Sequence, residues 1–257
     1  MDILADIPLY IILILIVASF FASFIDSIAG GGGLIMIPAL LLAGISPQFA
    51  LGTNKLVAIC GTGTALVNFI RKGKVIWQIA LPGLVCSFVG SVLGTKAILL
   101  FDEATVTKII MWILPFTAIV TFIPKKHLKS SLNDFSKKDI YVLGPLICFT
   151  IGFYDGFFGP GAGTFLIIAF YAVLGMNTVN ASAVAKVINL ASGVGAFVTF
   201  ALAGKILYGL ALPLIVANIL GGYVGSKIAI SKGHSFIKAM IVVVFIIMFV
   251  SLLIKFL

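Results

Sequence analysis

Long apolar runs separated by short polar segments fill almost the whole chain. Eight runs are long enough to cross the hydrocarbon core of a bilayer as helices, which takes about 20 apolar residues. They cover residues 8–28, 51–70, 77–100, 105–123, 140–158, 183–203, 209–230 and 236–256. Two shorter runs, 34–43 and 163–175, would span only about 15–20 Å as helices and are predicted to be broken or re-entrant. The pattern predicts an all-α membrane protein with eight to ten transmembrane segments.

The second half of the chain repeats the first. Residues 26–32 (DSIAGGG) align with residues 155–161 (DGFFGPG), and further along Lys55 aligns with Lys186 and Pro82 with Pro213, both at an offset of 131 residues. Such a series in register indicates a duplication. We therefore divide the chain into a first transmembrane repeat (1–124), a basic linker (125–139) and a second transmembrane repeat (140–257).

The distribution of lysine and arginine predicts the orientation, because cytoplasmic loops carry an excess of both. The loop 71–76 and the linker 125–139 are basic, whereas the loop between them carries Asp102 and Glu103. In the second repeat the bias reverses, which favours inverted repeats whose short segments also cross and whose two termini are external. The alternative has re-entrant short segments, eight spans, parallel repeats and a cytoplasmic N-terminus. No basic segment precedes the first run, so we expect a retained span rather than a cleaved signal peptide.

Composition excludes most other classes of protein. Hydrophobic residues make up 61% of the 257 residues and charged residues 10%, whereas a soluble domain has roughly 45–50% and about 25%. The net charge of +9 comes from basic loops, so no nucleic-acid partner is expected. The three cysteines form no C-x-x-C pair, and neither histidine has a ligand partner at useful spacing. Without a catalytic motif, we expect neither an enzyme nor a cofactor nor a metal site.

Two carboxylates lie inside apolar segments, and two lysines lie a turn into apolar helices, where a charge is costly and normally faces a partner or a cavity. Asp26 and Asp155 occupy equivalent positions in the two repeats, as do Lys55 and Lys186. We expect each aspartate to act either as a coupling residue or as a structural counter-ion. Lys55 is the first partner expected for Asp26, and Lys186 is the alternative.

Glycine-rich segments follow both aspartates, at residues 30–33 and 159–163. Unwound backbone inside a membrane is tolerated where it lines a cavity, and the N-terminus of the short helix that follows favours an anion. The candidate substrate-binding residues are Gly31, Gly32, Gly33, Thr53, Asn54, Lys55, Gly159, Gly161, Lys186 and Asn189. The alternatives are close helix packing for the glycines and interhelical hydrogen bonds for the polar side chains. Close packing is the preferred interpretation of Gly90 with Gly94 and of Gly221 with Gly225.

These segments resemble the TauE/SafE family of sulfite exporter, or TSUP-type, membrane proteins. FIDSIAGGGGLIMIPALLLAG followed by GTNKL resembles the first motif of the family, and GFYDGFFGPGAGTF with AKVINLAS resembles the second motif of its YfcA-like branch. The resemblance implies a multi-pass protein of the bacterial inner membrane with duplicated halves. It also implies transport of small anions, such as sulfite or other sulfur-containing or organic anions.

The residues and the resemblance together predict a secondary transporter of a small anion, with a site near the midplane between the two repeats. The expected partners are the anion, the lipid bilayer and a coupling proton or sodium ion. The alternatives are a passive anion channel and a membrane anion-binding sensor or subunit. Substrate identity, direction of transport and oligomeric state stay open.

Overall fold

The computed structural model describes residues 7–122 and 135–256, and the side chains of residues 7–113 and 135–232. Its described elements are α1 (Leu9–Ala29), α2 (Gly33–Leu42), α3 (Pro47–Arg71), α4 (Trp77–Leu99), α5 (Glu103–Phe122), a π-helical turn (Asp139–Leu143), α6 (Gly144–Phe157), α7 (Ala162–Leu174), α8 (Thr178–Leu202) and α9 (Tyr208–Phe256). No strand occurs among these residues. The all-α prediction is confirmed. Most of the basic linker lies outside the described residues.

Glycines in the left-handed region separate the short helices from the long ones. α1 ends at Gly30, whose φ of 81° lets its N–H turn back to the Asp26 carbonyl oxygen at 2.8 Å. Gly161, with φ of 80°, stands directly before α7. Residues with a Cβ rarely adopt this conformation. The glycine runs therefore break the helices where the sequence predicted.

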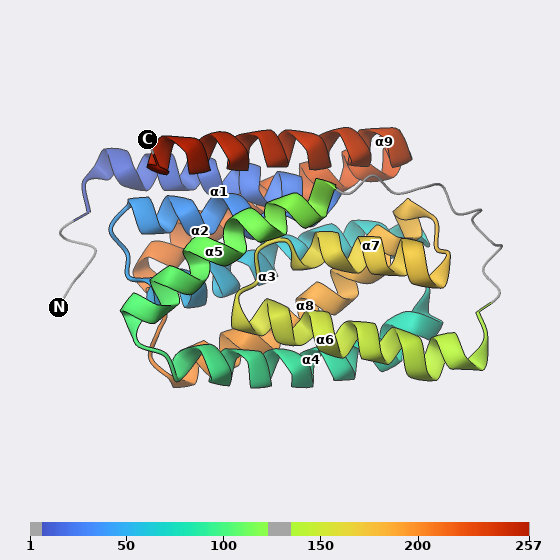
Figure 1. Ribbon diagram of the computed structural model, residues 1–257. Helices are drawn as coiled ribbons and strands as arrows, with labels where there is room; N and C mark the ends of the chain where they lie inside the picture. Colours follow the sequence, from blue (N-terminus) through green and yellow to red (C-terminus); the bar gives the residue numbers. More distant parts are fainter. Residues whose placement is uncertain (1–6, 123–134, 257) are drawn as a thin grey trace.

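Each repeat opens with a helical hairpin. The beginning of α1 packs with the end of α2, since Leu15 shares an apolar cluster with Leu40 and Ile45. In the second repeat, Ile147 of α6 packs in the cluster that contains Phe170 and Leu174 of α7. The short helices thus turn back from breaks in the interior (Figure 1). Each short helix carries the chain back toward the end at which its hairpin begins, and whether these segments cross the membrane or are re-entrant stays a prediction.

Six of the long helices form two groups of three, each held by close backbone contact. One group contains α4, α6 and α8, and the other contains α1, α3 and the first part of α9. In one group α4 and α6 approach so closely that a Cβ at Gly90 or Gly94 would collide with a carbonyl oxygen of α6. In the other group Gly221 and Gly225 of α9 meet the backbone of α1 in the same way. Small residues permit such approach between membrane helices. The preferred packing interpretation of these four glycines is confirmed.

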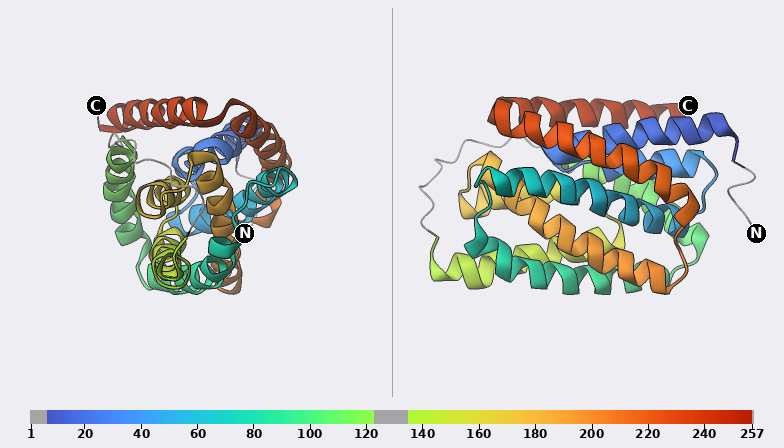
Figure 2. Two further views of the ribbon diagram at one scale, coloured as in Figure 1. Left: turned by 90° about the vertical axis from the view of Figure 1, so that its right-hand side faces the viewer. Right: turned by 180° about the vertical axis from the view of Figure 1, so that it is seen from behind.

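Equivalent helices of the two repeats run in opposite directions, α1 against α6 and α3 against α8 (Figures 1 and 2). The described chain begins and ends at the same end of the molecule, because α9 turns back on itself, while α6 begins at the opposite end. An opposed arrangement of this kind is compatible with inverted repeats. The orientation relative to a membrane stays a prediction.

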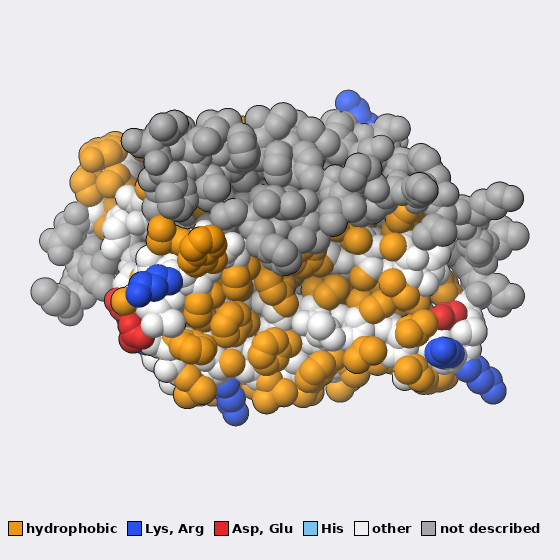
Figure 3. Space-filling view, in the orientation of Figure 1, with side chains coloured by type: hydrophobic (Ala, Val, Ile, Leu, Met, Phe, Trp, Pro, Cys, Tyr) orange, Lys and Arg blue, Asp and Glu red, His pale blue; other side chains and the backbone are white. Residues whose placement is uncertain are grey.

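Five of the described helical segments are long and apolar enough to span a membrane. They are Leu9–Ala29, Trp77–Leu99, Asp139–Phe157, Thr178–Leu202 and Tyr208–Lys232. Large apolar side chains are exposed along them, among them Leu13, Val85 and Val216. Figure 3 shows hydrophobic side chains over the described part of one face, with charged side chains toward its ends. This surface suits contact with lipid, while small and polar residues gather inside.

Candidate functional site

The glycine breaks of the two repeats meet in the centre of the molecule. The Thr164 N–H donates to the Gly30 carbonyl oxygen at 3.3 Å, and its hydroxyl donates to the Ala29 carbonyl oxygen at 2.7 Å. A Cβ on Gly30 would lie 2.7 Å from the Gly163 Cα, and one on Gly33 would lie 3.2 Å from the Pro160 Cα. Only breaks with minimal side chains permit this crossing.

Two ion pairs join the repeats at this crossing. The Lys55 Nζ lies 2.8 Å from Asp155 Oδ1, and the Lys186 Nζ lies 2.7 Å from Asp26 Oδ2. The expected pairing of Asp26 with Lys55 within one repeat is therefore wrong, and the alternative partner Lys186 is the one observed. The reason is that each lysine helix packs against the break of the opposite repeat, which a sequence offset does not reveal.

Each lysine also binds the end of a broken helix. The Lys55 ammonium donates to the Asp155 backbone carbonyl at 2.5 Å, and the Lys186 ammonium donates to that of Asp26. These carbonyls belong to the last turns of α6 and α1, where the helix dipole gives the carbonyl groups partial negative charge. The two ammonium groups thus occupy the places that a bound cation would favour at interrupted membrane helices.

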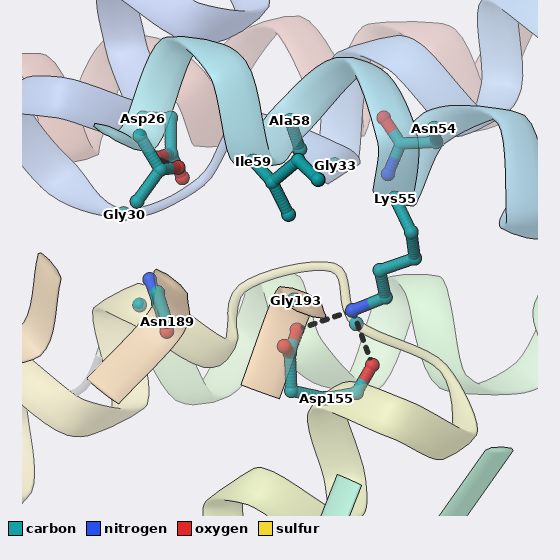
Figure 4. A pocket seen from close by; sticks show the side chains of 13 residues that line it. Asp26, Gly30, Gly33, Asn54, Lys55, Ala58, Ile59, Asp155, Asn189 and Gly193 are labelled. Carbon is teal, nitrogen blue, oxygen red and sulfur yellow. Dashed lines mark hydrogen bonds and ion pairs between the residues drawn. The ribbon is translucent and has the colours of Figure 1, made fainter. Parts of the chain in front are cut away.

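A polar pocket of about 50 Å³ lies between the breaks, which exceeds the roughly 10–15 Å³ that one water molecule needs. Seven candidate residues from the sequence line it: Asp26, Gly33, Asn54, Lys55, Asp155, Gly159 and Asn189. Figure 4 shows the Lys55 side chain extending from α3 to Asp155, with the Asn54 amide turned into the space between the helices. The structure therefore brings candidates from both repeats into one site.

Two asparagines give this pocket polar groups with unused hydrogen-bonding capacity. Asn54 is 7% exposed, and its amide lines the pocket without a side-chain hydrogen bond among the described residues. The Asn189 Oδ1 is buried and likewise lacks a partner within the described part of the chain. A buried amide without a partner is costly in a folded protein. Such groups favour a polar ligand or water in the pocket.

The two lysines differ in their access to the pocket. The Lys55 side chain is 7% exposed and lines the pocket, whereas the Lys186 side chain is fully buried and lies outside the lining. A lysine ammonium has three N–H donors, and Asp155 engages two of those of Lys55. The third N–H of the Lys55 ammonium is therefore available to a ligand in the pocket, whereas the Lys186 side chain is buried against Asp26.

Several other candidates lie beside the pocket rather than in its lining. Gly31, Gly32 and Gly161 belong to the breaks but do not line the pocket. Thr53 is buried, and its hydroxyl accepts a hydrogen bond from the Leu207 N–H at 3.0 Å. Thr53 therefore makes a structural hydrogen bond to the loop between α8 and α9, close to its alternative interpretation as an interhelical bond.

Sequence reasoning missed two hydroxyl groups that bind the aspartates. The Ser192 hydroxyl donates to Asp155 Oδ2 at 2.6 Å, and the Thr62 hydroxyl lies 3.4 Å from Asp26 Oδ2. Thr62 lies seven residues after Lys55, which is two helical turns and the same helix face. Other missed lining residues are apolar or glycine: Gly30, Ala58, Ile59, Gly163 and Gly193. The helix face of Lys55 was the available signal for Thr62, whereas Ser192 is not on the helix face of Lys186.

Comparison with known proteins decides the family. The family model described as "Sulfite exporter TauE/SafE" matches residues 15–252. The chain belongs to the TauE/SafE family. It is 39% identical over 250 residues to a probable membrane transporter protein, ORF9, of Sinorhizobium sp, with 96% of this chain and 94% of that protein covered.

Two further relatives support this assignment. The chain is 42% identical over 246 residues to a probable membrane transporter protein of Haemophilus influenzae, covering 93% of this chain and 92% of the relative. It is 38% identical over 243 residues to the probable membrane transporter protein YfcA of Escherichia coli strain K12, covering 93% and 88%. No solved structure matches the chain. The protein is a membrane transporter of the TauE/SafE family and not an enzyme, as predicted.

Proposed function

We propose that this TauE/SafE transporter carries a small sulfur-containing or organic anion, such as sulfite or a sulfonate, across the bacterial inner membrane. The anion occupies the central pocket, and Lys55 supplies one ammonium donor to it. The amide groups of Asn54 and Asn189 supply neutral hydrogen bonds. The support for an anion of this class is the chemistry of these donors together with the description of the family.

The first turns of α2 and α7 assist binding, because Gly33 and Gly163 in those turns line the pocket. Helix N-termini favour negative charge through their free N–H groups and their dipole. Transporters with interrupted helices place anionic groups of the substrate at such N-termini near the midplane. The two hairpins bring one N-terminus from each repeat to the same pocket.

Movement of the two helix groups against each other gives the transport step. One group contains α1 and the first part of α9, the other contains α4 and α6, and the broken helices of the two groups meet beside the pocket. Rocking of one bundle against the other around a fixed site exposes that site to each side in turn. A carrier of this kind saturates and supports counterflow, whereas a passive channel does neither.

The single observation that carries the proposal is the Asn54 amide, which lines the pocket and has no side-chain hydrogen bond among the described residues, beside the Lys55 ammonium. The experiment is a thermal-stability screen of the purified protein with sulfite, thiosulfate, alkyl sulfonates and carboxylates. We expect a saturable stabilisation by at least one sulfur-containing anion, weakened in Lys55→Gln and retained in Lys96→Gln. Lys96 is the matched control because it is exposed at the end of α4. An equal loss in both variants would refute the placement of the site.

A further inference from the structure

A second polar cavity, of about 30 Å³, adjoins the central pocket on the side of Asp26. Asp26, Asn54 and Thr62 belong to the walls of both cavities, while Ser23 and Asn218 line only the second. The cavity is therefore formed by α1, α3 and α9, within one of the two helix groups. Its neighbour on the other side is the proposed anion site.

Oxygen atoms with unused capacity surround this cavity. Ser23 is 4% exposed, and its hydroxyl has no hydrogen-bond partner among the described residues. The Asn218 Nδ2 donates to the Ser19 carbonyl oxygen at 3.0 Å and to its hydroxyl at 3.1 Å, which fixes the amide and leaves Oδ1 as an acceptor. A Cβ on Gly61 would collide with both Asn218 Oδ1 and Ser23 Oγ. These two oxygens therefore lie close together beside bare backbone.

The Asp26 carboxylate is only partly engaged. Lys186 binds Oδ2, whereas the Gly32 N–H lies 3.4 Å from Oδ1 and the Thr62 hydroxyl lies 3.4 Å from Oδ2. The Asp26 side chain is 20% exposed, although its lysine partner is fully buried. The exposed surface of the carboxylate lines both cavities. One carboxylate oxygen is thus available to a further cation.

The equivalent positions in the group formed by α4, α6 and α8 do not supply the same free oxygens. The positions of Ser23, Asn54 and Thr62 are taken there by Gly152, Ala185 and Gly193. Gly61 corresponds to Ser192, whose hydroxyl binds Asp155, and Asn218 corresponds to Ser87, whose hydroxyl donates to the Ile188 carbonyl oxygen at 3.2 Å. Both hydroxyl groups already donate hydrogen bonds within the protein. The cavity is a feature of the group formed by α1, α3 and α9 and not of the duplicated scaffold.

The charges of the site supply the remaining argument. Each of the two ion pairs has no net charge, so a bound anion leaves the site with a net negative charge in a medium of low dielectric. A small cation beside Asp26 restores neutrality. Carboxylate, hydroxyl and amide oxygens are the ligands of hard cations, and interrupted helices hold coupling ions close to their substrates.

We propose that the cavity beside Asp26 binds Na⁺, with ligands from Asp26, Ser23, Thr62 and Asn218, and that this Na⁺ enters together with the anion. The pairing with an anion rests on the proposed function. Lys186 repels the Na⁺ from the far side of the carboxylate, and the anion offsets this repulsion. Each ion therefore raises the affinity for the other by the same factor.

The test is the thermal stability of the full-length purified protein in NaCl, KCl and choline chloride at one pH and one ionic strength. We expect a saturable rise in melting temperature that is specific to Na⁺. Ser23→Ala and Thr62→Val should each weaken the apparent Na⁺ affinity by about tenfold or more, the size typical of altered metal surroundings. Ser87→Ala is the matched control, because it removes a buried hydroxyl at the position equivalent to Asn218, and it should keep the Na⁺ response.

Equal stabilisation by choline, or an unchanged Na⁺ response in both cavity variants, would overturn the proposal. If the same series repeated at a second pH shifts the melting temperature while Na⁺ does not, the proposal is overturned too, and a proton is assigned to Asp26. If one of the two cavity variants does not fold, the Na⁺ response of the other variant and the binding of radioactive Na⁺ to the wild type still test the proposal. Sulfite titrations in choline buffer separate the two proposals: a sulfite response without any Na⁺ response refutes only the Na⁺ site, and the reverse result refutes only the anion.

Discussion

Lys186 of α8 binds Asp26 of α1 at 2.7 Å, across the boundary between the two repeats. In the corresponding ion pair, Lys55 of the first repeat binds Asp155 of the second repeat at 2.8 Å. Each lysine caps the end of a broken helix that belongs to the other repeat. The two repeats are thus joined by ion pairs at the point where their helices are interrupted, and the pocket lies between the two ion pairs.

The first prediction tests this pairing by double substitution. Asp26→Asn alone leaves the buried ammonium of Lys186 without its counter-ion, which typically costs about 3–5 kcal/mol. Asp26→Asn with Lys186→Gln should be more stable than the worse of the two single variants. The measurement is the thermal unfolding of purified variants in detergent. The matched control combines Asp26→Asn with Lys55→Gln and should recover nothing; recovery there instead would mean that the pairing is within one repeat.

A second prediction separates the two lysines, which the sequence makes equivalent. Lys186 is sealed against Asp26 while Lys55 faces the pocket. Lys186→Gln should therefore lower the melting temperature more than it lowers the anion affinity of the folded fraction. Lys55→Gln should weaken anion affinity by the larger factor. Melting curves with and without the stabilising anion measure both quantities, and indistinguishable variants would argue against a division of roles.

The contact between the breaks gives a third prediction. Gly30 and Gly44 have nearly the same φ, 81° and 82°, but nothing lies within 4 Å of a Cβ on Gly44, whereas one on Gly30 would collide with Gly163. Gly44→Ala should cost about 1–2 kcal/mol, the price of a left-handed conformation. Gly30→Ala should destabilise the protein far more. Equal melting temperatures for the two variants would show that the breaks do not touch.

The fourth prediction concerns orientation. α9 ends at the same end of the molecule at which α1 begins, and α6 begins at the opposite end (Figure 2). The basic linker at 125–139 is expected in the cytoplasm, so both termini should be external. Alkaline phosphatase fused to the C-terminus should be active, and phosphatase inserted in the linker should be inactive. Activity at both positions, or at neither, would contradict the opposed arrangement.

Much of this architecture could be predicted from the spacing of apolar residues and from composition. The helices follow the apolar runs, and Asp26, Asp155, Lys55 and Lys186 were identified because charges inside apolar segments need partners. The partners themselves were not predictable, because periodicity assigns a residue to a helix face and not to a neighbouring helix. Thr53 illustrates the same limit: its place before Asn54 and Lys55 suggested a ligand role, yet it points to Leu207.

The cavity beside Asp26 was also hidden from the sequence. Ser23 and Asn218 are far apart along the chain and belong to different repeats, and only the packing of α9 on α1 and α3 brings them together. The signal that does exist is a difference between the repeats, namely Gly61 in one and Ser192 in the other. Positions at which duplicated halves differ in polarity are therefore informative about function.

The most direct test of the central claim is sulfite counterflow in proteoliposomes that contain the wild type, Asn54→Ala or Lys96→Gln. Preloaded sulfite should drive saturable uptake of labelled sulfite by the wild type and by Lys96→Gln, and Asn54→Ala should raise the half-saturating concentration. Other anions from the binding screen are tested in the same way. Uptake that does not saturate, or that is identical in Asn54→Ala and Lys96→Gln, would contradict a carrier whose substrate occupies the central pocket.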